Sequence, residues 1–171
     1  GSEMCIRDRT DGSAAVLLAS DEWANKNNLD IESYITSFEI AAVNYIDNEG
    51  LLMAPAYAVS EMLKKQNLNL QDFDFYEIHE AFAAQTLATI NAWKSEEFCK
   101  SKLGREKVMG SFDHNKLNVK GGSLAIGHPF AATGARIVAT LSKLLKDNGG
   151  GKGLISICTA GGMGITAILE R

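Results

Sequence analysis

Residues 154–169 read LISICTAGGMGITAIL, and they carry the strongest indication of the fold. Residues 154–158 are an apolar run of strand length, residues 159–164 form a glycine-rich turn, and residues 165–169 are a second apolar run. The short connection favours an antiparallel hairpin. Further upstream, strand-like runs alternate with helical patterns, which predicts an α/β protein whose helices cover a mostly parallel sheet.

The same patterns predict the elements that lead to this hairpin. Strand-like runs occupy residues 14–19, 34–43 and 73–78, and helices are expected after Ser20, from Pro55, over 81–93 and over 131–146.

Two of these segments carry an expectation about burial. The helix over 81–93 is apolar nearly all round, which is typical of a helix buried between layers. Residues 96–118 are charged and irregular, and we expect a surface excursion there. His114 and Cys99 lie in this excursion, so surface roles are expected for both.

The composition argues against several classes of function. The 171 residues suit one ordinary domain, and the net charge of −4 without a basic stripe argues against nucleic-acid binding. No run of eighteen apolar residues occurs, which predicts no membrane span. The three cysteines, Cys5 among them, lack CxxC spacing, which predicts no metal site and fits a reducing compartment. Gly1-Ser2 resembles an expression-vector scar, and we take residues 1–9 as a tag or unstructured head.

Cys158 is the sharpest candidate for chemistry. It ends the 154–158 run and is followed by Gly161, Gly162 and Gly164. Backbone N–H groups of such a turn can stabilise a developing oxyanion, and a nearby histidine can hold the sulfur as a reactive thiolate. A buried structural cysteine before a hairpin loop fits the same pattern, so both interpretations stay open.

Two histidines occupy comparable positions. His128 lies between Gly127 and Pro129, which suits either a general base or a capping histidine at a helix start. His79 directly follows the 73–78 run, where a polar strand-to-helix junction is the plainer interpretation. Ends of strands form the ligand crevice of α/β sheets, so the pattern indicates a Cys/His enzyme with acyl chemistry.

Four motifs, in order, resemble the C-terminal half of a thiolase. They are TDGSAAVLLAS (10–20), YEIHEAFAAQ (76–85), NVKGGSLAIGHPFAATGARI (118–137) and ISICTAGGMGITAILER (155–171). The resemblance implies a thiolase-type half, with a five-stranded mixed sheet and helices on both faces. It also implies that residues 10–30 are a remnant of the preceding N-terminal domain and that residues 31–171 are the C-terminal domain.

Details of the motifs indicate which thiolases the chain resembles most. HEAFA replaces the commoner NEAFA, CTAGG replaces CxGGG, and an insertion spans residues 96–117. With GHPFAATG, this combination is similar to the 3-ketoacyl-CoA thiolases that form the β-subunit of the fatty-acid oxidation (trifunctional) complex. The implied reaction is CoA-dependent cleavage of a 3-oxoacyl-CoA to acetyl-CoA and a shortened acyl-CoA.

The resemblance also implies residue roles. His128 would take the proton of a thiol in the N-terminal half and then help to bind the thioester oxygen. Cys158 would be the acid/base for the acetyl α-carbon and the CoA thiol. His79 would replace the asparagine that orients a water in the oxyanion hole, and the backbone N–H of Ala160 would be an oxyanion donor. The candidates for the substrate pocket are Phe82, Gly127, Gly161 and Gly162.

Cofactor, partners and location follow as expectations of the same resemblance. No cofactor is bound permanently, and CoA and acyl-CoA are the substrates. The partners are the absent N-terminal thiolase half, further copies in a homo-oligomer, and the hydratase/dehydrogenase α-subunit of the oxidation complex. The location is the cytoplasm, or the mitochondrial matrix in a eukaryote.

The acyl-accepting cysteine belongs to the absent half, so we expect the chain to be a fragment that is inactive alone. Three other readings stay open. They are an acetoacetyl-CoA-forming biosynthetic thiolase, a small thioesterase in which Cys158 is acylated, and a non-catalytic assembly module.

Overall fold

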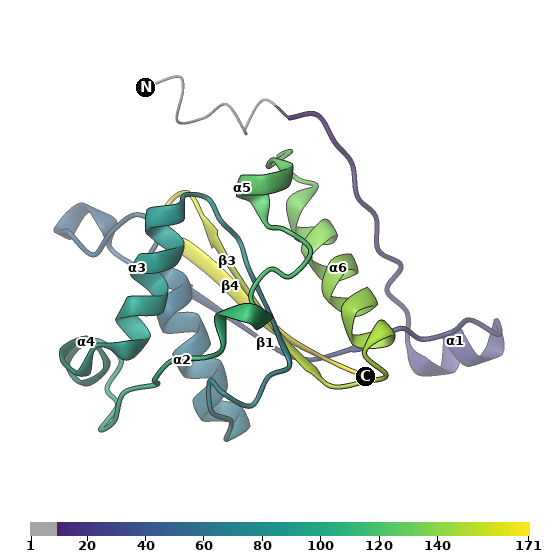
Figure 1. Ribbon diagram of the computed structural model, residues 1–171, viewed down its shortest axis with the longest axis horizontal. Helices are drawn as coiled ribbons and strands as arrows, with labels where there is room; N and C mark the ends of the chain where they lie inside the picture. The colour runs from purple at the N-terminus through teal and green to yellow at the C-terminus, as the bar shows by residue number, and fades with distance from the viewer. Residues whose placement is uncertain (1–9) are drawn as a thin grey trace.

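The computed structural model describes residues 10–171, and over these the chain forms one mixed sheet of four strands in the order β1–β4–β3–β2 (Figure 1). Strand β4 pairs antiparallel with both β1 and β3, and β2 pairs parallel with β3. The strands are β1 (Tyr34–Ala42), β2 (Phe75–Ile78), β3 (Lys152–Thr159) and β4 (Met163–Glu170). The expected hairpin and mixed sheet are confirmed, whereas the expectation of a mostly parallel sheet is wrong.

The expected fifth strand is the second correction. Residues 14–19 are extended and exposed, and they pair with no strand in the described chain. Leu17 and Leu18 are 72% and 69% exposed. A strand needs a neighbour that satisfies its backbone N–H and C=O groups, and this segment lies away from the sheet beside α6 (Thr133–Asp147) (Figure 1).

Helices cover both faces of the sheet, as expected. Helices α2 (Ala54–Gln66) and α3 (Ala83–Lys94) lie on one side and α6 on the other (Figure 1). The alternation along the strands sorts the side chains accordingly: Leu154 and Ile168 pack in the larger core, and the neighbouring Ile155 and Leu169 pack beneath α6.

Short elements complete the chain. Ser20 caps the first of them as expected, since its side chain accepts a hydrogen bond from the N–H of Trp23. These elements are α1 (Asp21–Lys26), η2 (Tyr45–Asp47), α4 (Glu96–Ser101), η3 (His114–Lys116) and α5 (Ser123–Ile126).

The segment over residues 96–118 is only partly a surface excursion. Cys99, Leu103, Met109 and Phe112 are buried in the larger core. The reason is their apolar side chains, which interrupt the charged residues and pack on α3 and β2. The expectation of a surface role for Cys99 is therefore wrong.

Helix α3 departs from its expectation as well. It buries one face, which includes Thr86, Ile90 and Trp93, whereas Leu87 is 54% exposed. In the described chain α3 packs on α2 and α4, and the opposite face of α3 has no element over it. The apolar composition of α3 thus reflects a helix with one buried face and one uncovered apolar face, rather than a helix buried on all sides.

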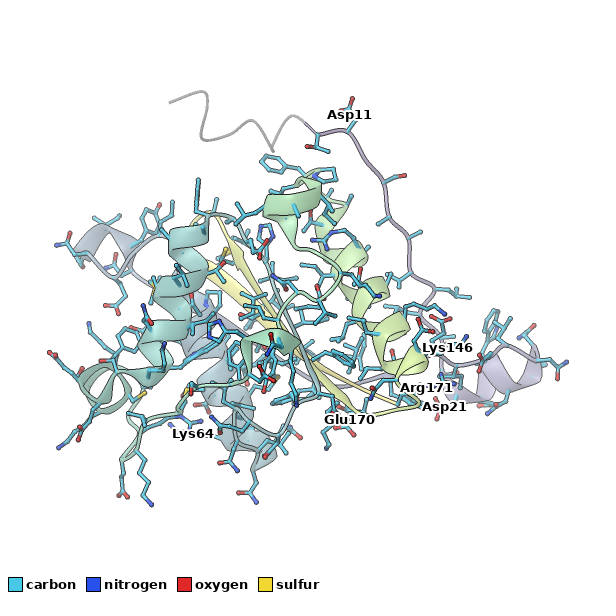
Figure 2. All side chains as sticks on the ribbon, viewed as in Figure 1. Asp11, Asp21, Lys64, Lys146, Glu170 and Arg171 are labelled. Atoms are coloured by element: carbon cyan, nitrogen blue, oxygen red, sulfur yellow. The ribbon has the colours of Figure 1, made fainter. Side chains whose placement is uncertain are left out.

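The segment that leads into β1 is tied to the end of α6. Lys146 Nζ lies 2.8 Å from a carboxylate oxygen of Asp30 and 2.9 Å from one of Glu32, and Arg171 donates to the carbonyl oxygens of Ile31 and Glu32. Figure 2 shows Lys146 and Arg171 together at this end of the molecule. Ion pairs this exposed to solvent contribute little to stability, so they orient the segment more than they stabilise it.

No helix within residues 10–171 has the length and hydrophobicity that crossing a membrane requires.

Candidate active site

The three side chains proposed for chemistry meet at one end of the sheet. The parallel pairing of β2 and β3 places Ile78 beside Ser156. His79, which follows β2, and Cys158, the last residue but one of β3, therefore lie at the same edge. Both line a small cavity of about 10 Å³, together with Ser156. The ring of His128 lies 4.4 Å from that of His79, centroid to centroid.

Asn118 fixes the strand end that carries His79. Its Oδ1 accepts a hydrogen bond from the N–H of Ile78 at 2.9 Å, and its Nδ2 donates to the carbonyl of Ile78 and to Glu80, each at 2.9 Å. Glu80 in turn accepts from the N–H of Leu124 at 3.1 Å. His79 is therefore held between two hydrogen-bonded neighbours, and its side chain is only 4% exposed.

The ring orientation of His128 follows from a chain of hydrogen bonds. Its Nδ1 lies 2.7 Å from Oγ1 of Thr133, and that hydroxyl donates to the carbonyl of Pro129 at 3.3 Å. Because the hydroxyl proton is used there, Thr133 accepts from His128, and Nδ1 is the donor. The neutral ring then carries a lone pair on Nε2, which is the atom a general base needs.

The turn before His128 is tightly packed. Gly127 has φ +91°, and a Cβ there would lie 2.5 Å from Oγ1 of Thr10. A side chain at this position would be strained and would also displace residue 10. Glycine at position 127 thus allows residue 10 to pack closely against this turn. The proposed place of Gly127 in a substrate pocket stays a prediction.

Cys158 lies near the end of β3 and is 8% exposed. In the hairpin it faces Gly164, where a Cβ would lie 2.7 Å from the backbone nitrogen of Pro55. Gly162 has φ +75°, and a Cβ there would lie 2.5 Å from the carbonyl oxygen of Val43. These two glycines let the hairpin pack closely on its neighbours, a role that the sequence pattern did not indicate.

The remaining candidates are spread around this edge. Phe82 is half-buried at the start of α3, and Ala160 and Gly161 are exposed in the β3–β4 turn. Their roles as pocket residues or oxyanion donor stay predictions. His114 is exposed, as expected, and its ring stacks on that of Phe112. Cys5 lies outside the described residues.

The structure adds a buried carboxyl group near the charge of an arginine, which the sequence analysis did not single out. Glu77 of β2 is 1% exposed, and burial raises its pKa to about 7, against a smaller lowering by the charge of Arg136 on α6. A signal was available, since alternation in FYEI places Glu77 on the sheet face opposite to Tyr76, and helices were expected over both faces.

No group of three or more His, Cys, Asp and Glu side chains that could hold a metal ion occurs within residues 10–171.

Comparisons with known proteins agree with this architecture. The family model for the thiolase C-terminal domain matches residues 29–171. The 3-ketoacyl-CoA thiolase of Shewanella loihica is 45% identical over 161 residues, which are 94% of this chain and 36% of that protein. The chain therefore spans about a third of the length of the curated relatives that it matches.

Solved structures give the same result. The peroxisomal 3-ketoacyl-CoA thiolase of Saccharomyces cerevisiae superposes with a TM-score of 0.68 at 38% identity, over 87% of this chain and 37% of that chain. The Acat5 thiolase of Ascaris suum, solved in complex with coenzyme A, superposes with a TM-score of 0.67 at 33% identity, over 90% of this chain and 34% of that chain. The resemblance carried by the four sequence motifs is confirmed, and the chain belongs to the thiolase family, of which it carries the C-terminal domain.

Proposed function

We propose that this chain supplies the histidine and second-cysteine half of a 3-ketoacyl-CoA thiolase site. The observation that supports this most is the meeting of His79, His128 and Cys158 at one sheet edge. The relatives named 3-ketoacyl-CoA thiolase and the relative solved with coenzyme A support the substrate class.

In the proposed reaction, a cysteine thiolate from the N-terminal half attacks the 3-oxo carbon of the 3-oxoacyl-CoA. His128 takes the thiol proton on Nε2, the ring nitrogen opposite to the Nδ1 that is bonded to Thr133. The bond between the 3-oxo carbon and the α-carbon breaks, and Cys158 donates its proton to the α-carbon, which leaves as acetyl-CoA. Cys158 then takes the proton of the incoming CoA thiol, whose sulfur attacks the acyl thioester and leaves as the shortened acyl-CoA. The released cysteine thiolate regains its proton from His128.

Burial supports the acid/base role of Cys158. A carbanion next to a thioester needs a proton donor on one side and hydrogen-bond donors to the oxygen on the other. Cys158 is nearly buried beside His79, so water does not compete freely for either group. The same two side chains would serve the reverse, acetoacetyl-CoA-forming reaction, and the direction of flux stays a prediction.

The uncovered face of α3 supports a second domain as partner. Leu87 is 54% exposed there, flanked by small apolar side chains. The yeast thiolase is built as five α–β–α–β–α layers from two core domains of identical topology. We infer that a preceding domain of this kind covers α3 and provides the acylated cysteine, and that residues 10–30 are the end of that domain. Homo-oligomers, the α-subunit partner and the cytoplasmic or matrix location stay predictions of the family resemblance.

Two assays test the proposal. Full-length thiolase that carries these residues is expected to release acetyl-CoA from a 3-oxoacyl-CoA and CoA, whereas the 171-residue chain alone is expected to release none. Intact-mass measurement after mixing the chain alone with a reactive acyl-CoA distinguishes a thiolase from a thioesterase. In a thioesterase, Cys158 itself would gain the acyl group. A full-length protein that folds and binds partners but transfers no acyl group would be the assembly module instead.

A further inference from the structure

We propose that Ser123 and Arg136 are positioning residues that hold His79 as the neutral ring protonated on Nε2. This inference rests on the proposed function, because it names the atom through which His79 would donate a hydrogen bond in the oxyanion hole. Neither residue touches the reacting atoms, and both act through His79.

Ser123 lies directly behind the His79 ring. Its side chain is fully buried, and its Oγ lies 3.0 Å from Nδ1 of His79. The loop reaches this close because position 122 is glycine, where a Cβ would lie 2.2 Å from a carboxylate oxygen of Glu80. The same carboxylate oxygen accepts from the N–H of Leu124, which fixes the loop on the strand end and Ser123 with it.

Arg136 decides which way the hydrogen bond between Ser123 and His79 runs. A guanidinium group only donates hydrogen bonds, and Nη2 of Arg136 lies 3.2 Å from the Ser123 Oγ, so the serine oxygen accepts from it. The hydroxyl retains one proton to donate, and Nδ1 of His79 is the partner within reach.

The opposite direction would leave a buried polar proton without a partner. If Nδ1 of His79 also donated to Ser123, the hydroxyl proton would find no acceptor in the described part of the chain. An unsatisfied buried donor costs about 1–3 kcal/mol. We therefore assign the serine proton to Nδ1, which places the proton of the neutral ring on Nε2.

The buried setting of Arg136 supports this direction. Its Nε and Nη1 atoms are buried without a hydrogen-bond partner in the described residues, so Nη2 makes the side-chain hydrogen bond that orients the group. Glu77 lies across the same interface of β2 and α6, where burial raises its pKa and the charge of Arg136 lowers it by a smaller amount.

The adjacent rings would then hold opposite tautomers. His128 donates from Nδ1 to Thr133 and keeps a lone pair on Nε2, whereas His79 accepts on Nδ1 and keeps a proton on Nε2. The rings lie 4.4 Å apart. One ring is thereby prepared to take a proton and the other to donate a hydrogen bond, which are the two functions that the thioester chemistry requires.

The tautomers can be read directly by NMR of the chain labelled with ¹⁵N-histidine. The sequence contains three histidines, and single His→Asn variants assign their ring signals. At a pH where the rings are neutral, we expect His79 to show a protonated Nε2 and an unprotonated Nδ1. A wild-type His79 protonated on Nδ1 would overturn the proposal, whatever any variant does.

Three variants and a control test the residues themselves. Ser123→Ala is expected to shift His79 toward the Nδ1-protonated form, and Ser123→Thr, which keeps the hydroxyl, is expected to retain the wild-type signals. Arg136→Met is expected to mix the two forms, because the hydroxyl becomes free to accept. Thr133→Ala is the matched control and should change His128 while His79 stays as it is. Unchanged His79 signals in folded Ser123→Ala would refute the assignment.

A kinetic arm connects the geometry to the proposed reaction. In full-length thiolase, Ser123→Ala is expected to lower kcat about ten- to a hundredfold with little change in KM, less than the ~10²–10³-fold loss on removing an oxyanion donor outright. Ser123→Thr should recover most of that loss. A rise in KM with an unchanged kcat would contradict the proposal that Ser123 positions His79. Absence of turnover in the wild type would reject the proposed function, while the NMR result would still decide the tautomer.

Discussion

Glu77→Gln is expected to make the chain more stable at alkaline pH and to leave its stability at acidic pH nearly unchanged. Burial raises the pKa of Glu77 from 4.5 to about 7, with Arg136 lowering it and Glu80 raising it by smaller amounts. The folded state therefore holds this proton more tightly than the unfolded chain does. Stability from the protonated carboxyl is fully present below pH 4.5 and is lost as the pH rises through about 7.

The size of the effect follows from the same values. A rise in pKa from 4.5 to about 7 corresponds to about 3 kcal/mol of stability lost between acidic and alkaline pH. Glutamine keeps the shape of the side chain but cannot ionise, so the variant should escape this loss. Above pH 8, Glu77→Gln should therefore unfold with a free energy about 3 kcal/mol larger than the wild type.

Chemical denaturation of both proteins from pH 4.5 to 8.5 measures this difference. Glu61→Gln is the matched control, because Glu61 lies half exposed on α2 and its carboxylate contact with Lys64 is long, at 3.9 Å. Its unfolding free energy should follow the wild type at every pH. Parallel pH profiles for Glu77→Gln and the wild type would show that Glu77 is ionised inside the fold and would refute the reasoning.

Three further predictions concern folding and association. Gly134→Ala should stabilise the chain by about 0.5–1 kcal/mol in denaturant titrations, because position 134 is helical and a Cβ there meets no atom within 4 Å. Asn118→Ala should cost about 2–4 kcal/mol in the same titrations, because it leaves buried groups of Ile78 unsatisfied; a loss under 1 kcal/mol would contradict the role of Asn118. The isolated chain should self-associate in light scattering through the apolar face of α3, and Leu87→Glu should reduce this; a monomeric wild type over a broad concentration range speaks against it.

Local patterns predicted most elements of the fold because they were strong. The 154–169 stretch gave the β3–β4 hairpin, and Pro55 marked the first turn of α2. Sheet order and direction depend instead on which strands meet in space, and alternation with helices favoured a parallel sheet that does not form. Residues 14–19 have the composition of a strand, but pairing requires a neighbour, which composition does not report.

Local patterns likewise predicted only part of the candidate site. His79, His128 and Cys158 stood out because each follows a strand or borders glycines, and the structure brings them together. The residues that orient His79 are ordinary polar residues: Asn118 lies in the loop before α5, and Ser123 is the first residue of α5. Their contacts span some forty positions in the chain, and no local pattern encodes such long-range hydrogen bonds.

The most direct test of the account is the acyl-enzyme mass of full-length thiolase that carries these residues, measured after mixing with an acyl-CoA. His128→Ala is expected to lose the acyl-enzyme, because nothing takes the thiol proton. Cys158→Ala is expected to form it and yet to lose carbon–carbon bond formation by ~10²–10⁴-fold, while His79→Asn stays closest to the wild type. If folded Cys158→Ala condenses acyl groups near the wild-type rate, or His128→Ala acylates normally, the roles assigned to these residues are wrong.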